Sequence, residues 1–133
     1  MSRSYLVYQF RPEVYDIINE NPQSEIARIA FDLRLLNEKS AEHSVNDALF
    51  HNMYYPTKFL HLGVLSESVD PLEDVFDAGN GYGKAKVTIS LAKGDTSLSV
   101  GNIIVHLQQN KAYLCMPTGW HELARELVLG IKL

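Results

Sequence analysis

The chain has 133 residues and a mass of 15.0 kDa, with 46% hydrophobic and 21% charged residues, which suits one domain around a single core. Its net charge is −4 and its pI is about 5.7, a balance that disfavours non-specific nucleic-acid binding, because such binding relies on clustered Lys and Arg. The N-terminal stretch lacks the apolar core and cleavage site of a signal peptide, and no apolar run approaches the roughly 18–20 residues of a membrane span. We therefore expect one domain, residues 1–133, of a soluble cytoplasmic protein.

The first part of the chain predicts a strand followed by helices. Residues 5–10, YLVYQF, are rich in aromatic and β-branched residues, and Pro12 suits the first position of a helix. Ser24 is a plausible N-cap for the next helix, whose apolar residues recur at steps of three or four. Ser44, with Asp47 three residues on, predicts the cap of a further helix. Pro56 then ends a helical half that spans about residues 12–56.

The second part of the chain predicts a sheet. From Lys58 the apolar period changes to two, which favours a central strand, and residues 70–79, DPLEDVFDAG, carry the cap, first-turn proline and terminal glycine of a short crossing helix. Polar and apolar residues alternate strictly over residues 84–92, so we expect a strand with one solvent-exposed face and one apolar, buried face that includes Ile89 and Leu91. Residues 102–107 and 112–116 form a hairpin across the turn QQNK, and residues 121–130 suit a last short helix.

These elements predict an α+β fold, in which an N-terminal strand and helices pack on a small, mostly antiparallel β-sheet with one crossing helix. The β-rich half spans about residues 57–133. Within it, Gly101 and Asn102 tolerate positive φ and are expected to turn the chain into the following strand. Cys115, the single cysteine, lies in the apolar run AYLCM and is predicted to be a small buried hydrophobe.

Several short motifs of the β-rich half also carry a resemblance. LEDVFDAGNG, TSLSVGNIIV, KAYLC and TGWHEL together resemble the C-terminal half of small uncharacterised proteins of phages, plasmids and other mobile elements, some labelled YodL-like. The match covers residues 58–123, with Asn102 where that pattern usually has Asp and Trp120 where it usually has Phe. The resemblance implies a mobile-element origin and no particular mechanism.

The motifs for common catalytic and ligand chemistries are incomplete. GNGYGKA, residues 79–85, resembles a phosphate-binding loop, but Ala78 stands where that loop needs Gly before its Gly-Lys pair, and Ala85 stands where it needs Ser or Thr after the pair. The histidines show no metal-ligand spacing; they are His43, His51, His61, His106 and His121. Cys115 with His106 or His121 is the only nominal nucleophile–base pair. We therefore predict no catalytic residue, no metal and no cofactor, and an enzyme stays a minority alternative.

Aromatic residues at the ends of elements suggest a surface for a partner protein, because Tyr and Trp are favoured anchors of interfaces. The candidates are Tyr54, Tyr55, Tyr82 and Trp120. Burial is the alternative, with Tyr54 and Tyr55 covering the junction of the two halves and Trp120 closing the end of the sheet. The leading hypothesis is a phage or mobile-element accessory protein that binds a host protein and inhibits a defence or regulatory system.

A local lysine face gives the alternative function of nucleic-acid or nucleotide binding. Its residues would be Lys84, Lys86, Lys93 and Lys111. If they line one groove, binding should weaken steeply with salt.

Overall fold

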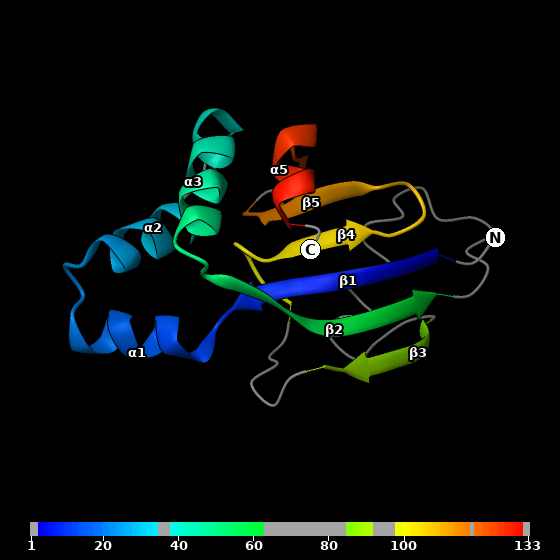
Figure 1. Ribbon diagram of the computed structural model, residues 1–133, viewed down its shortest axis with the longest axis horizontal. Coiled ribbons are helices and arrows are strands. Elements are labelled where there is room, and N and C mark those ends of the chain that lie inside the picture. The colour runs from blue at the N-terminus through cyan, green and yellow to red at the C-terminus, as the bar shows by residue number, and fades with distance from the viewer. Residues whose placement is uncertain (1–2, 35–37, 63–84, 92–97, 118, 132–133) are drawn as a thin grey trace.

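The computed structural model describes residues 3–34, 38–62, 85–91, 98–117 and 119–131. Over these residues the chain forms a six-stranded sheet in the order β3-β2-β1-β4-β5-β6, in which every neighbouring pair is antiparallel, together with four helices. Figure 1 shows the sheet with the helices gathered beside and above one part of it. The α+β fold is confirmed.

The first strand occupies the middle of the sheet. β1 (Arg3–Phe10) lies between β2 (Tyr54–Leu62) and β4 (Ile103–His106), so the N-terminal strand joins segments far apart in the sequence. β3 (Ala85–Ser90) pairs with β2 and forms one edge of the sheet. β5 (Lys111–Met116) pairs with β4, and β6 (Gly119–Glu122) forms the other edge. The predicted hairpin and the predicted N-terminal strand are therefore confirmed.

Local sequence signals explain where the first helices begin. α1 (Pro12–Glu20) starts at its proline, where the missing N–H costs no helical hydrogen bond. α2 (Glu25–Arg34) begins after Ser24, whose Oγ accepts a hydrogen bond from the Ala27 N–H at 3.2 Å. That bond is the predicted cap. α3 (Glu38–Phe50) and α5 (Arg125–Ile131) complete the described helices, and no helix in this part of the chain is long and apolar enough to cross a membrane.

Three predicted boundaries are wrong. Ser44 is buried inside α3 and does not cap a helix. Pro56 does not end the helical half but lies within β2, beside a register shift at Val7 and Tyr8 that places the proline opposite Tyr8. A bulge of this kind lets a strand accommodate a residue without an N–H. His121 and Glu122, expected in the last helix, belong to β6.

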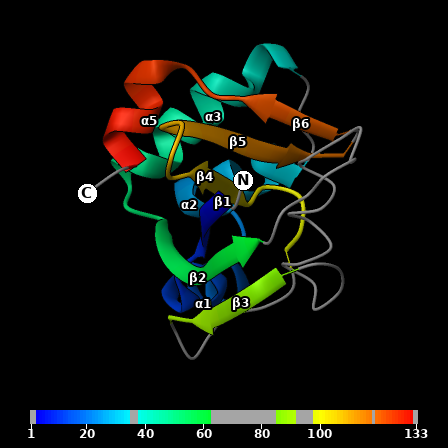
Figure 2. The same cartoon turned by 90° about the vertical axis from the view of Figure 1, so that its right-hand side faces the viewer.

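The two faces of the sheet carry different clusters of buried side chains. The helices pack on the first face, where α3 and α5 meet β4 and β5; the cluster includes Val45, Val105, Leu114 and Val128. The second face carries Tyr5, Val7, Leu60, Leu98 and Ile104. In Figure 2 the two helices α3 and α5 lie on one side of the sheet, which shows that they cover the first face only.

The strand at residues 85–90 is confirmed, but Ile89 and Leu91 of its apolar side are not buried as predicted. Ile89 is 47% exposed, and Leu91, directly after β3, is 48% exposed. The predicted crossing helix at residues 70–79 lies outside the described residues.

Candidate binding surface and cavity

Tyr54 is a core residue. Its side chain is only 6% exposed, its ring centroid lies 5.0 Å from that of Phe10, and its hydroxyl donates a hydrogen bond to the Gly101 carbonyl oxygen. Burial raises the pKa of the Tyr54 hydroxyl far above its ordinary value. The structure therefore corrects the placement of Tyr54 at a partner-binding surface, since its side chain fills the junction between helices and sheet.

Trp120 packs inward at the edge of the sheet. It is half-buried in β6 opposite Cys115 of β5, and it packs against the cluster on the second face beside Tyr113. Its ring therefore extends the second core over the last strand. Tyr82, the remaining aromatic candidate besides Tyr55, lies outside the described residues.

Tyr55 is half-buried and supports an arginine. The guanidinium carbon of Arg11 lies 5.5 Å from the Tyr55 ring centroid and over the ring, a favourable cation–π arrangement. Arg11 Nε donates to the Asn52 carbonyl oxygen at 3.0 Å, and Nη2 donates to Asn52 Oδ1 at 3.4 Å. The Arg11 backbone N–H also donates to the Met53 carbonyl oxygen at 2.8 Å. The turn between α3 and β2 thus fixes both the backbone and the side chain of Arg11.

This arginine borders a cavity of about 180 Å³ on the first face of the sheet. The cavity lies where the C-terminal ends of α3 and α5 meet β1 and β2. Its lining residues are Tyr8, Arg11, Leu49, Asn52, Tyr54, Pro56, Gly130 and Ile131. Burial raises the pKa of the Tyr8 hydroxyl, so this wall residue is neutral at physiological pH. We call this space the Arg11 cavity.

Beside the cavity, part of the first face is not covered by any helix that the structure describes. The register places Leu6, Phe59 and Ile89 side by side across β1, β2 and β3, and strand alternation puts Leu91 on the same face. Leu6 and Phe59 are half-buried and belong to neither buried cluster. None of the helices that the structure describes lies across β2 and β3 in Figure 1. We call Leu6, Phe59, Ile89 and Leu91 the open half of the first face.

The Ser99–Asn102 turn is a structural feature rather than a binding site. Gly101 has a φ of +92°, as its type allows, whereas Asn102 is not among the residues with positive φ in the described chain. Asn102 is buried, and its Oδ1 accepts hydrogen bonds from the Ser99 N–H at 2.8 Å and from Gln9 Nε2 at 3.1 Å. Thr57 Oγ1 in turn donates to Gln9 Oε1 at 2.7 Å. A buried polar chain therefore ties this turn to β1 and β2.

The four lysines of the alternative function are only partly described. Lys111 is exposed at the start of β5, and Lys86 belongs to β3, whereas Lys84 and Lys93 lie outside the described residues. β3 and β5 are four strand spacings apart in the sheet, roughly 19 Å. Lys111 instead borders a separate cavity of about 290 Å³ together with Glu122 and Arg125. The described residues do not bring Lys86 and Lys111 into one compact patch.

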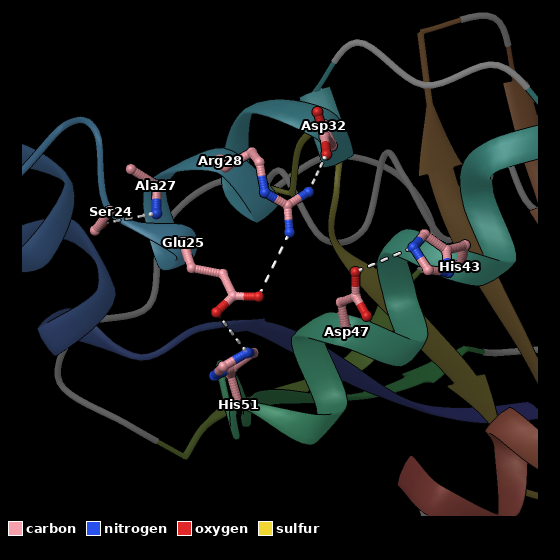
Figure 3. Close-up of polar contacts among 8 residues, drawn as sticks. All are labelled: Ser24, Glu25, Ala27, Arg28, Asp32, His43, Asp47 and His51. Carbon is pink, nitrogen blue, oxygen red and sulfur yellow. Dashed lines mark hydrogen bonds and ion pairs between the residues drawn. The ribbon is translucent and has the colours of Figure 1, made fainter.

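Two histidines form carboxylate pairs on the helical surface. His43 Nε2 lies 3.4 Å from Asp47 Oδ2 within α3, and His51 Nε2 lies 3.7 Å from Glu25 Oε2 of α2. Figure 3 shows the His43–Asp47 pair on α3 and the pair that His51, directly after α3, makes with Glu25 of α2. In the part of the chain that the structure describes, no three His, Cys, Asp or Glu side chains come together in a way that could hold a metal ion.

A third histidine pair joins distant parts of the chain. His121 Nε2 of β6 lies 3.0 Å from Glu42 Oε1 of α3, and the same oxygen accepts the Ala124 N–H at 3.0 Å. Glu42 thereby connects α3 to the residue that precedes α5. Neither cavity described above is lined by His121 or Glu42. A His–Glu pair can act in acid–base catalysis, but this pair lies outside both cavities and instead joins α3 to β6 and to the start of α5.

Cys115 is buried and free of a disulfide, as its apolar setting predicts. His121, one of its two nominal partners, points its Nε2 at Glu42. His106 is buried as well, with its ring 4.8 Å from that of Tyr5 and its Nδ1 accepting the Gln109 N–H at 3.2 Å. Both histidines make these contacts with groups other than Cys115.

Sequence reasoning missed Arg11, the one cation among the described residues that line the first-face cavity. Its signal was weak, because Arg11 merely precedes Pro12 and reads as the boundary between a strand and a helix. It also missed the Glu42–His121 contact, whose residues are separated by 79 positions. Only the tertiary fold brings such residues together.

A scan of protein-family models and searches of curated proteins and solved structures found no match to this chain.

Proposed function

We propose that the protein acts by binding a partner protein through the open half of the first face. The observation that carries this proposal is the exposure of Ile89 and Leu91, at 47% and 48%, beside the half-buried Phe59. Contiguous exposed apolar side chains on a folded domain are typical of interaction surfaces. Exposed singly, such residues would need no explanation.

The edge position of β3 strengthens the proposal. An edge strand has backbone N–H and C=O groups that can pair with a further strand, and partner segments commonly add to such edges. Ile89 and Leu91 flank this edge and would supply apolar contacts to the added segment. Tyr55 is not part of this surface, because the register pairs it with Gln9 on the other face of the sheet.

We further propose that the partner is a host protein and that the chain is a phage or mobile-element accessory protein that inhibits a defence or regulatory system. Its support is the resemblance of the motifs around residues 58–123 to mobile-element proteins. Asn102 is compatible with that pattern, because its side-chain oxygen is the acceptor in its bonds with Ser99 and Gln9. The Asp of the pattern would accept the same two bonds.

The test compares two residues of equal exposure. Ile89 and Phe31, an exposed residue of α2, are both 47% exposed. We expect Ile89→Lys to abolish the capture of a stoichiometric host partner from lysate, and Phe31→Lys to leave it unchanged. A photo-crosslinking amino acid placed at position 89 should label that partner directly. Equal capture by both variants, or no partner with the wild-type protein, would contradict the proposal.

Self-association needs its own measurement. Sedimentation velocity of the wild-type protein and of Ile89→Lys distinguishes a host partner from a second copy of this chain. A wild-type dimer that Ile89→Lys dissociates would assign the open half to a homodimer interface and refute the host-partner proposal. A monomer in both cases supports it.

A further inference from the structure

We propose that the Arg11 cavity binds a carboxylate carried on a short apolar group, such as a small aromatic or aliphatic monocarboxylic acid. This site goes beyond the partner-binding surface, because it needs no protein partner and uses different side chains.

The first step is the state of the arginine. Two N–H groups of Arg11 are committed to Asn52, and a guanidinium has further N–H donors in the same plane. These donors make no hydrogen bond and no ion pair with any residue that the structure describes. A planar fork of free donors is the arrangement that carboxylates prefer.

Arg28 shows what an arginine with a structural role looks like in this protein. Its guanidinium contacts Glu25 at 3.6 Å and Asp32 at 3.1 Å, as Figure 3 shows. Arg11, by contrast, is held in place by a backbone carbonyl, an amide oxygen and the Tyr55 ring. It is therefore oriented without being neutralised, and its charge is available to a ligand.

The second step is the wall of the cavity. Leu49, Ile131 and Pro56 are apolar, and the Tyr8 and Tyr54 rings line the space beside them. A cavity of about 180 Å³ is smaller than the roughly 300 Å³ at which drug-sized pockets begin. It suits a fragment with one ring or a short chain, and one cation suits one carboxylate.

The other cavity provides an internal contrast. The space of about 290 Å³ beside Lys111 and Arg125 also contains Glu122, which disfavours a second carboxylate by charge repulsion. If a carboxylate bound only because of a nearby positive charge, it would bind equally well in the cavity beside Arg125 and in the Arg11 cavity.

The experiment is an NMR titration of the ¹⁵N-labelled chain with phenylacetate, with 2-phenylethanol as the neutral control of similar shape. We expect saturable shifts of the amides of Leu49, Asn52 and Ile131, with a Kd on the order of 1 mM for a fragment. The alcohol should bind at least about tenfold more weakly, because it cannot form the charge-assisted pair. Equal binding of the two probes, no saturable shift, or shifts confined to the Lys111 cavity would overturn the proposal.

Three variants test the assignment to this cavity. Arg11→Gln should weaken phenylacetate at least about tenfold, whereas Arg125→Gln should leave the Kd within about twofold. Because Arg11 also supports the turn at Asn52, Gly130→Leu provides a test that leaves the arginine intact. A Cβ at Gly130 would lie 3.9 Å from Leu49 Cδ1, an ordinary contact, so a longer side chain can enter the cavity from α5. Unchanged affinity in a folded Gly130→Leu protein would refute the site.

The two proposals fail independently. Ile89→Lys should not affect phenylacetate binding, and Arg11→Gln should not affect association through the edge of β3. A protein that binds the acid but captures no host partner would retain the cavity and lose only the proposed function.

Discussion

The two halves of the sheet's first face differ in cover although one row of apolar side chains runs across both. One row of side chains crosses the sheet in register; it consists of Ala112, Val105, Leu6, Phe59 and Ile89. Ala112 and Val105 are fully buried beneath the helices, Leu6 and Phe59 are half-buried, and Ile89 is 47% exposed. Exposure therefore rises along a single row of apolar residues from the centre of the sheet to the β3 edge.

The cause lies in how the helices are attached. α5 follows β6 almost directly and turns back over β5, and Glu42 of α3 accepts the Ala124 N–H just before α5 begins. This contact holds the two helices over β4 and β5. No helix of the described chain is tethered to β2 or β3 in this way. Alternation of apolar residues predicts a buried face of a strand only where another element covers that face.

The largest predicted effect is on the covered half. Leu114→Ala should lower the free energy of unfolding by about 2–5 kcal/mol, because Leu114 is fully buried between the sheet and the helices and its removal leaves a cavity. Urea unfolding followed by circular dichroism gives this value. A loss below about 1 kcal/mol would mean that the helices do not pack on β5 as described.

The next effect concerns the buried polar chain on the second face. Asn102→Ala removes the acceptor of the bonds from Ser99 and Gln9 and should cost about 2 kcal/mol of unfolding free energy. Asn46→Ala, at an exposed position of α3, is the matched control and should change stability by less than about 0.5 kcal/mol. Equal effects of the two substitutions in urea unfolding would contradict the role of the turn.

Local signals predicted much of the covered half. Pro12 and Ser24 predict helix starts through interactions within one turn, and the polar turn QQNK between two apolar segments predicts the hairpin. The predicted cap at Ser44 was wrong, because a serine inside a helix and a serine at a helix N-cap look alike in sequence. Pro56 misled because the register shift that accommodates it depends on pairing with β1, which is remote in the chain.

The candidate site was less predictable for the same physical reason. The exposure of Ile89 depends on which other elements cover its strand, and no feature of the strand itself encodes that cover. The Arg11 cavity requires the ends of α3 and α5 to meet β1 and β2, and these elements lie in all parts of the chain. Tyr54 shows the converse, since its aromatic character suggested an interface while the fold buries it.

A smaller effect should appear at alkaline pH. Burial raises the folded-state pKa of Tyr54, so above pH 10, its ordinary value, the unfolded chain loses this proton while the folded protein keeps it. The contribution is fully present below that pH, and the free energy of unfolding then falls as pH rises, by up to about 1.4 kcal/mol per pH unit for one tyrosine. Tyr54→Phe should cost about 1 kcal/mol at neutral pH through the lost bond to Gly101 and should make the alkaline slope shallower. Urea unfolding between pH 8 and about 11 measures both, and an unchanged slope would contradict the burial of this hydroxyl.

The smallest predicted effect is on the open half, where Ile89→Ala should change the free energy of unfolding by less than about 0.5 kcal/mol. The side chain is as apolar as that of Leu114, but about half of it already contacts water in the folded state, so truncation removes little burial. Urea unfolding of the two variants at one protein concentration therefore measures the contrast between the halves directly. A loss above about 1.5 kcal/mol that grows with protein concentration would show that a second copy covers the open half, because only association makes stability depend on concentration.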